Sequence, residues 1–140
     1  MCRAWSWNAL SAEPSSWIVA AVGLSGALAV LLGAFGAHGL AERLTPDQEA
    51  IWATANQYHF VHTLALALGA ALLRGDANRR LLQGLCAAWV AGIVLFSGTL
   101  YLLAVTGIGW LGAITPVGGV LFVAGWLALM VAGLRSRPSI

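Results

Sequence analysis

The sequence predicts an all-α polytopic membrane protein, a bundle of four transmembrane helices in one domain. The chain is 60% hydrophobic and only 9% charged over 140 residues, which is too little charge to cover the surface of a soluble domain of this size. Four apolar runs each reach the length of about 20 residues that a helix needs to cross the bilayer. The runs occupy most of the chain, so no soluble domain is left over.

The transmembrane domain extends over residues 17–134, between an amino-terminal segment, 1–16, and a short tail, 135–140. The first apolar run is longer than the 7–15 residues, roughly, of a signal-peptide core, so we expect it to stay uncleaved as a membrane helix. The four predicted spans are 17–37, 51–73, 81–105 and 110–134.

Arginine placement predicts the orientation. Four spans put the amino terminus, the second loop and the carboxyl terminus on one side, and all arginines except Arg43 lie on that side. Positively charged loops stay in the cytoplasm, so both termini are expected to be cytoplasmic and the protein to be multi-pass. The same topology accounts for the net charge of +2, which therefore gives no reason to expect a nucleic-acid partner.

Two loops carry clear signals for where helices begin and end. Thr45 suits the N-cap position, Pro46 the first helical position, and Gln48 completes a capping box, so the second helix is expected to begin at Pro46. Gly107 and Gly109 predict a tight hairpin, which makes the third and fourth spans antiparallel neighbours.

Small residues repeat at intervals of four in the first span, and two adjacent glycines follow Pro116 near the start of the fourth span. Such residues let two helix backbones approach closely in a membrane. The partner surface is expected within the chain or in another copy. The residues that we assign to helix packing are Ser25, Ala29, Gly33, Ala37, Gly118 and Gly119.

Polar side chains within the spans gather toward the outer half of the predicted bundle. Asn56, His59 and His62 fall within roughly a third of the circumference of the second span. Lipid cannot satisfy imidazole and amide groups, so this stripe should face protein or a water-filled cavity. The predicted polar pocket consists of His38, Asn56, Tyr58, His59, His62, Ser97, Tyr101 and Thr115.

Three interpretations of this pocket stay open. The first is a hydrogen-bond network that locks the bundle, at about 0.6–2 kcal/mol per bond. The second is a site for a lipid headgroup, a quinone or another small ligand, or a proton path. The third is a metal or haem site through His38, His59 and His62. Because His-x-x-His alone is a weak signal and no carboxylate lies in the spans to orient the rings, we expect no metal or cofactor.

Four strings of the sequence resemble one family closely: GAFGAHGL (33–40), WATANQYHFVHTLAL (52–66), LFSGTLYLLAVTG (95–107) and ITPVGGVLFVAGWLAL (114–129). They are similar to the YgdD-like group of small four-helix membrane proteins, a domain-of-unknown-function family with eukaryotic relatives. The resemblance covers about residues 17–134, and it implies four transmembrane helices in the bacterial inner membrane. It implies no reaction. Family-typical positions would be Gly33, Gly36, His38, Thr54, Tyr58, His62, Ser97, Gly98, Tyr101, Thr115, Pro116, Gly118 and Gly119.

Catalytic patterns are poor in this sequence. No acidic residue lies within the spans to complete a triad with Ser97 and a histidine, and no glycine loop of the phosphate-binding type occurs. We therefore expect a non-enzymatic binding or accessory protein that contacts membrane lipids, as a homo-oligomer or as part of a larger membrane complex. The alternative is a transport or channel component that conducts protons or a small solute.

Overall fold

The computed structural model describes residues 16–73 and 79–135, and over these residues the chain is helical, without a β-strand. The predicted all-α fold class is therefore confirmed. Residues 1–15 of the predicted cytoplasmic segment, residues 74–78 of the predicted second loop and residues 136–140 of the tail lie outside the described residues.

A helix lies over each of the four apolar runs. We use the word rod for each continuous helical stretch. The third rod contains α3, η3 and α4 without a break, and we call it the α3–α4 rod. The described elements are, in order, α1 (Ser16–Ala34), the π-helical turn η2 (Phe35–Gly39), α2 (Pro46–Leu72), α3 (Arg79–Gly92), the π-helical segment η3 (Ile93–Gly98), α4 (Thr99–Thr106) and α5 (Leu111–Arg135).

Three of the described rods are long and apolar enough to cross a membrane: Ser16–Gly39, Arg79–Thr106 and Leu111–Arg135. The remaining rod, α2, is long enough to cross a membrane, with 27 residues. Its mean hydropathy is too low for it to count among these spans. The cause is the same polar group that the sequence singled out, because Asn56 and His59 lie in its middle. The four-span count therefore depends on how these side chains are covered.

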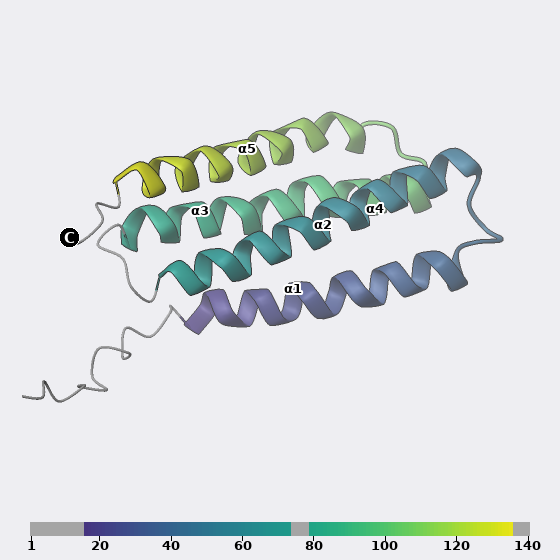
Figure 1. Ribbon diagram of the computed structural model, residues 1–140. Helices are drawn as coiled ribbons and strands as arrows, with labels where there is room; N and C mark the ends of the chain where they lie inside the picture. The colour runs from purple at the N-terminus through teal and green to yellow at the C-terminus, as the bar shows by residue number, and fades with distance from the viewer. Residues whose placement is uncertain (1–15, 74–78, 136–140) are drawn as a thin grey trace, which may run out of the picture.

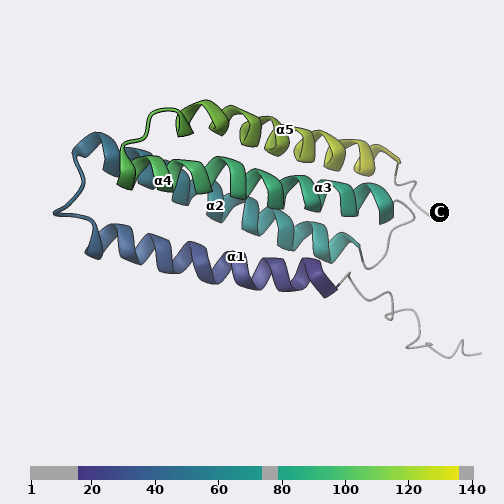
Figure 2. The same cartoon turned by 180° about the vertical axis from the view of Figure 1, so that it is seen from behind.

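The rods lie side by side, with successive rods antiparallel (Figures 1 and 2). The connection from α1 to α2 and the hairpin from α4 to α5 lie at one end, and the start of α1 and the end of α5 lie at the other. α2 packs between α1 and the α3–α4 rod, while α5 packs on that rod. This order leaves a groove on each side of α2.

The two loop predictions are confirmed. α2 begins at Pro46 after a complete capping box, in which the Thr45 backbone N–H donates to Gln48 Oε1 over 2.9 Å and the Gln48 N–H donates to Thr45 Oγ1 over 3.4 Å. Gly107 ends α4 at a φ of 68°, a left-handed conformation that glycine adopts without strain. α5 follows after four residues of hairpin, Gly107 to Trp110.

The small residues of α1 face α2 within the chain. Ser25 and Ala29 contact it, and a Cβ on Gly33 would come within 3.0 Å of the Asn56 side chain. Ala37, in contrast, is exposed, and Gly36 packs against Trp52 in its place. An α-helix has 3.6 residues per turn, so a contact stripe spaced by four drifts off the partner by the last turn.

The glycine pair of α5 divides between two environments. A Cβ on Gly118 would overlap the backbone nitrogen of Phe96, so α5 and η3 approach each other there at backbone distance. A Cβ on Gly119 would lie 3.8 Å from the Phe96 ring, which is ordinary van der Waals contact. Gly118 therefore sets the packing of α5, and Gly119 borders a groove.

Candidate functional site

One group of polar side chains joins α1, α2 and α4, and we call it the α1–α2 polar network: Ser25, Asn56, His59, Thr63 and Tyr101. Ser25 Oγ lies 3.1 Å from His59 Nε2 and 2.5 Å from Thr63 Oγ1. Asn56 Nδ2 donates to the Ala29 carbonyl over 2.8 Å and to the Tyr101 hydroxyl over 3.0 Å. The Tyr101 hydroxyl lies 3.4 Å from His59 Nδ1.

The direction of each hydrogen bond in this network can be worked out from Thr63. The Thr63 hydroxyl donates its only proton to the His59 carbonyl, which can only accept. Ser25 must then donate to Thr63, so Ser25 accepts from His59 Nε2–H. In a neutral ring His59 Nδ1 is left as the acceptor for Tyr101. Every member of the network is hydrogen-bonded, which suits a structural link between helices.

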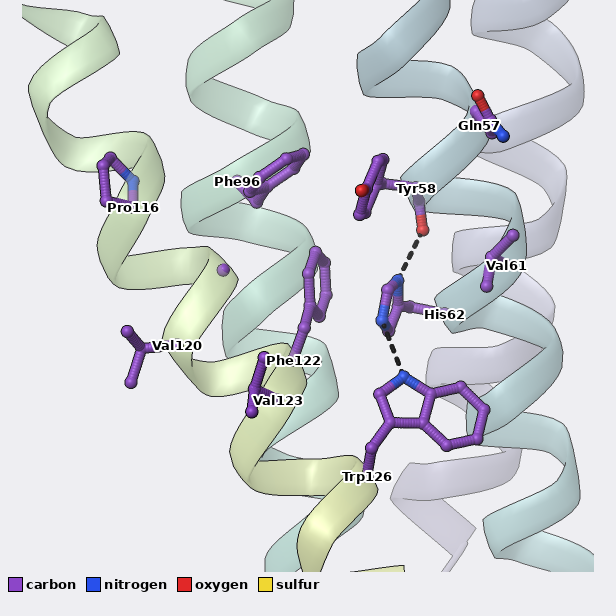
Figure 3. Close-up of a pocket in the computed structure, with 11 residues that line it drawn as sticks. Gln57, Tyr58, Val61, His62, Phe96, Pro116, Val120, Phe122, Val123 and Trp126 are labelled. Carbon is purple, nitrogen blue, oxygen red and sulfur yellow. Dashed lines mark hydrogen bonds between the residues drawn. The ribbon is translucent and has the colours of Figure 1, made fainter.

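His62 points away from this network and toward α5 (Figure 3). It is 3% exposed. Its imidazole stacks on Phe122 with ring centroids 3.4 Å apart and planes 10° apart. Nδ1 lies 2.9 Å from the Tyr58 carbonyl, and the Trp126 indole Nε1–H donates to Nε2 over 3.2 Å.

These two bonds define the protonation of His62. A carbonyl oxygen can only accept and an indole N–H can only donate, so Nδ1 carries the proton and Nε2 is bare. The ring is therefore neutral, in the opposite tautomer to His59. No counter-charge is near among the described carboxylates, because Glu42, Asp47 and Glu49 are all exposed.

A groove of about 740 Å³ opens beside His62, between α2 and α5, with η3 at its base (Figure 3). We call it the α2–α5 groove. Its walls are largely aromatic and aliphatic. The exposed Tyr58 side chain points into the groove, while the Gln57 amide lies on the far side of α2 (Figure 3). The lining residues are Gln57, Tyr58, Val61, His62, Phe96, Pro116, Gly119, Val120, Phe122, Val123 and Trp126.

The other predicted pocket residues form no hydrogen bond with either group, although Ser97 lines a groove together with Ser25, His59 and Tyr101. His38 is exposed in the last turn of η2. Thr115 Oγ1 lies 3.0 Å from Thr99 Oγ1, which links α5 to the start of α4. Ser97 is fully buried, and its hydroxyl has no hydrogen-bond partner among the described residues. The residues of the predicted polar pocket thus fall into several groups in the structure rather than into one.

The metal alternative also lacks its ligand set. His59 and His62 turn to different neighbours, and His38 is exposed, so the three imidazoles do not converge. Within residues 16–73 and 79–135, no group of three or more His, Cys, Asp or Glu side chains could hold a metal ion.

The sequence-based pocket did not include Trp126 and Phe122, two residues of α5 that contact His62. A usable signal was present. Tryptophan prefers the membrane interface, yet Trp126 lies well inside its span, where its indole N–H needs an acceptor. A tryptophan within a span and a buried histidine on a facing helix are complementary partners.

Comparisons with known proteins agree on one family. The family model described as "Protein of unknown function (DUF423)" matches residues 32–119. The UPF0382 membrane protein YwdK of Bacillus subtilis is 47% identical over 110 residues, covering 77% of this chain and 88% of the relative. A UPF0382 membrane protein of Haemophilus influenzae is 40% identical over 117 residues, covering 83% and 92%. No solved structure matches the chain. These relatives are named membrane proteins. The predicted family resemblance is confirmed, and the chain belongs to the DUF423 family.

Proposed function

We propose that this protein crosses the bacterial inner membrane four times, with both termini in the cytoplasm, and binds an amphipathic membrane lipid in the α2–α5 groove without catalysing a reaction. The fourth span would be α2. Its buried polar groups pair mainly with α1, α4 and α5 rather than with lipid, which removes most of the cost of placing them in the bilayer. Arg79, Arg80 and Arg135 at the end away from the α1–α2 loop support the orientation.

The observation that carries the binding proposal is the pairing of one polar group with an aromatic groove. At one end, the Tyr58 side chain points into the groove (Figure 3) and is 42% exposed, so its hydroxyl is open to a bound molecule. Along the rest of the groove, Phe96, Phe122 and Trp126 offer apolar surface. A molecule with a polar head and an apolar tail satisfies both ends. The volume of 740 Å³ lies within the range of about 300–1,000 Å³ of small-molecule sites.

A non-enzymatic role agrees with the chemistry of the groove. His62 has both ring nitrogens engaged by protein groups, so it has no free nitrogen to act as a base. The described carboxylates are all exposed near the α1–α2 loop, away from the groove. What the groove offers is shape, apolar surface and the hydroxyl of Tyr58.

The transport alternative requires a continuous polar path through the protein. A cluster of buried apolar side chains, which includes Leu66, Leu82 and Trp89, fills the half of the described structure away from the α1–α2 loop. That packing favours binding over conduction. Oligomer formation or attachment to a larger membrane complex is compatible with the proposal, and a native mass spectrum reports the copy number directly.

The test uses the full chain in nanodiscs of phosphatidylethanolamine and phosphatidylglycerol, with a trace of phospholipid that carries a photoreactive diazirine on one acyl chain. Cross-links to peptides of α2 and α5 are expected in the native protein. Gly119→Leu adds a side chain at the groove wall, where a Cβ has room, and should lower the labelling several-fold. The matched control is Gly23→Leu, since a Cβ on Gly23 meets nothing within 4 Å. Equal labelling of the two variants would refute the proposal.

A further inference from the structure

A second groove lies on the opposite side of α2, between α1 and the α3–α4 rod. We call it the α1–α4 groove. It has a volume of about 340 Å³, and its surface is almost entirely apolar. α1 packs mainly on α2 and not on the α3–α4 rod, which leaves this space open. The lining residues are Ala21, Leu24, Ser25, Leu28, Leu32, His59, Val90, Ile93, Val94, Ser97, Gly98 and Tyr101.

Ser97 is the unusual member of this lining. Serine and threonine hydroxyls inside helices ordinarily donate to the carbonyl four residues earlier. Thr63 and Thr99 do so, over 2.8 Å and 2.6 Å. Ser97 does not: it is 0% exposed, and its Oγ has no hydrogen-bond partner in the described part of the chain. An unpaired buried hydroxyl carries a desolvation penalty, so it calls for a partner.

The other polar groups that border the α1–α4 groove cannot be that partner. Ser25, His59 and Tyr101 bond within the α1–α2 polar network, and none of them forms a hydrogen bond with Ser97 Oγ. Ser97 is therefore a hydroxyl with its proton free to donate, in the wall of an apolar groove. A molecule that fits must be mostly hydrocarbon and carry at least one accepting oxygen.

The depth of Ser97 restricts the molecule further. It lies about 13 Å along the rod from Thr106, at 1.5 Å per residue, which places it inside the hydrocarbon region of the proposed topology. The ester groups of a phospholipid, held near the interface by a charged head, do not match that depth. A neutral lipid without a charged head does, because it can lie wholly within the hydrocarbon.

From these observations we infer that the α1–α4 groove is a second binding site, which takes a neutral carbonyl-bearing lipid of the quinone class, whose carbonyl oxygen accepts a hydrogen bond from Ser97. The isoprenoid or alkyl tail would lie along Leu24, Leu28 and Val94. The inference concerns binding alone. It is independent of the α2–α5 groove, because α2 separates the two sites.

The probe is a benzoquinone with a decyl tail and ¹³C-labelled carbonyls, titrated into nanodiscs that hold the full chain. A hydrogen bond from Ser97 should shift the infrared band of one carbonyl to lower frequency. Ser97→Ala should remove the shifted band and weaken binding about five- to tenfold, the loss of one hydrogen bond. Its thermal stability should not fall, because the hydroxyl has no partner in the free protein.

Two further variants separate the sites. Gly98→Leu places a side chain in the α1–α4 groove, where a Cβ on Gly98 has 4.0 Å of clearance, and should abolish the shifted band. Gly119→Leu blocks only the α2–α5 groove and should leave the band unchanged. An unshifted carbonyl in the native protein, as expected if an ordered water were the partner of Ser97, would overturn the inference. So would a shifted band of equal strength in Ser97→Ala.

Discussion

The indole of Trp126 donates a hydrogen bond to Nε2 of His62 over 3.2 Å, and this contact joins α5 directly to α2. Phe122, one turn earlier in α5, stacks on the same imidazole with centroids 3.4 Å apart. Both helices also pack on the α3–α4 rod. His62 is thus a residue through which α2 and α5 meet, at the wall of the α2–α5 groove, beside the stacked pair of Tyr58 and Phe122.

His62→Leu should destabilise the protein by about 1–3 kcal/mol, because leucine keeps the apolar volume but leaves the Trp126 N–H without its acceptor. Trp126→Phe removes the donor from the other side. The two effects should be less than additive, since the variants remove the same bond. Chemical unfolding in detergent measures the stability of the two single variants and of the double variant.

Leu64→Ala is the control for this cycle. Leu64 is on the same helix and 66% exposed, so its truncation should cost less than His62→Leu. Two outcomes would show that the hydrogen bond does not link the helices. One is a His62→Leu variant as stable as the native protein, and the other is a double variant whose loss of stability equals the sum for His62→Leu and Trp126→Phe.

The position of α2 within the sequence was predictable in detail, because its signals are local. Thr45, Pro46 and Gln48 specify a helix start through backbone chemistry that needs no tertiary contact. The same is true of Gly107, whose left-handed φ ends α4. Such signals carry over from sequence to structure because the chain satisfies them alone.

The division of the polar stripe was not predictable from α2 alone. At 100° per residue, Asn56 and His62 lie at opposite edges of an arc of roughly a third of the helix. An arc that wide touches more than one neighbouring helix, so the Asn56 edge meets α1 and the His62 edge meets α5. The packing of α1 and α5 decides which neighbour covers each edge. The sequence pattern of α2 does not predict that packing.

The π-helical segments were also beyond the sequence analysis. η3 places Phe96 in the α2–α5 groove and Ser97 in the α1–α4 groove, one residue apart. The run Ile93–Gly98 is as apolar as its flanks, so periodicity gives no sign of the extra residue in the turn. The backbone contact between Gly118 and Phe96 depends on this segment.

Gly118→Ala should destabilise the protein by about 1–3 kcal/mol, because its Cβ would overlap the backbone of η3 and force α5 outward. Gly133→Ala is the matched control in the same helix, where a Cβ meets nothing within 4 Å. That change should leave stability unchanged or raise it slightly, since alanine favours the helix. Thermal unfolding of both variants in one detergent decides the matter, and equal melting temperatures would contradict the close approach.

Metal content gives a third prediction. Gently purified protein should hold no stoichiometric zinc, copper or haem, because both ring nitrogens of His59 and of His62 already bond to protein groups. Elemental analysis and an absorption spectrum measure it. An equimolar metal that disappears in His62→Ala would show that the imidazole is a ligand and that its bonds to Tyr58 and Trp126 are not the resting state.

The proposed topology makes a fourth prediction. A reporter fused after Ile140 should behave as cytoplasmic, and one inserted within residues 40–44 as external, because the arginines cluster at the end opposite the α1–α2 loop. Paired alkaline phosphatase and fluorescent-protein fusions at both positions measure it. An external carboxyl terminus would reverse the assignment of the polar half of the bundle to the outer leaflet.

The last prediction concerns the two buried histidines, which should be neutral and in opposite tautomers. His62 donates from Nδ1 to the Tyr58 carbonyl and accepts at Nε2 from Trp126. His59 donates from Nε2 to Ser25, because Thr63 has already given its proton to a carbonyl. Solid-state ¹⁵N and ¹³C NMR of histidine-labelled protein in lipid distinguishes the two forms, and His62→Gln assigns the signals. His59 should keep its Nε2–H form in that variant, because its network does not include His62. A shared tautomer, or a doubly protonated ring at neutral pH, would contradict the hydrogen-bond directions that separate the α1–α2 polar network from the α2–α5 groove.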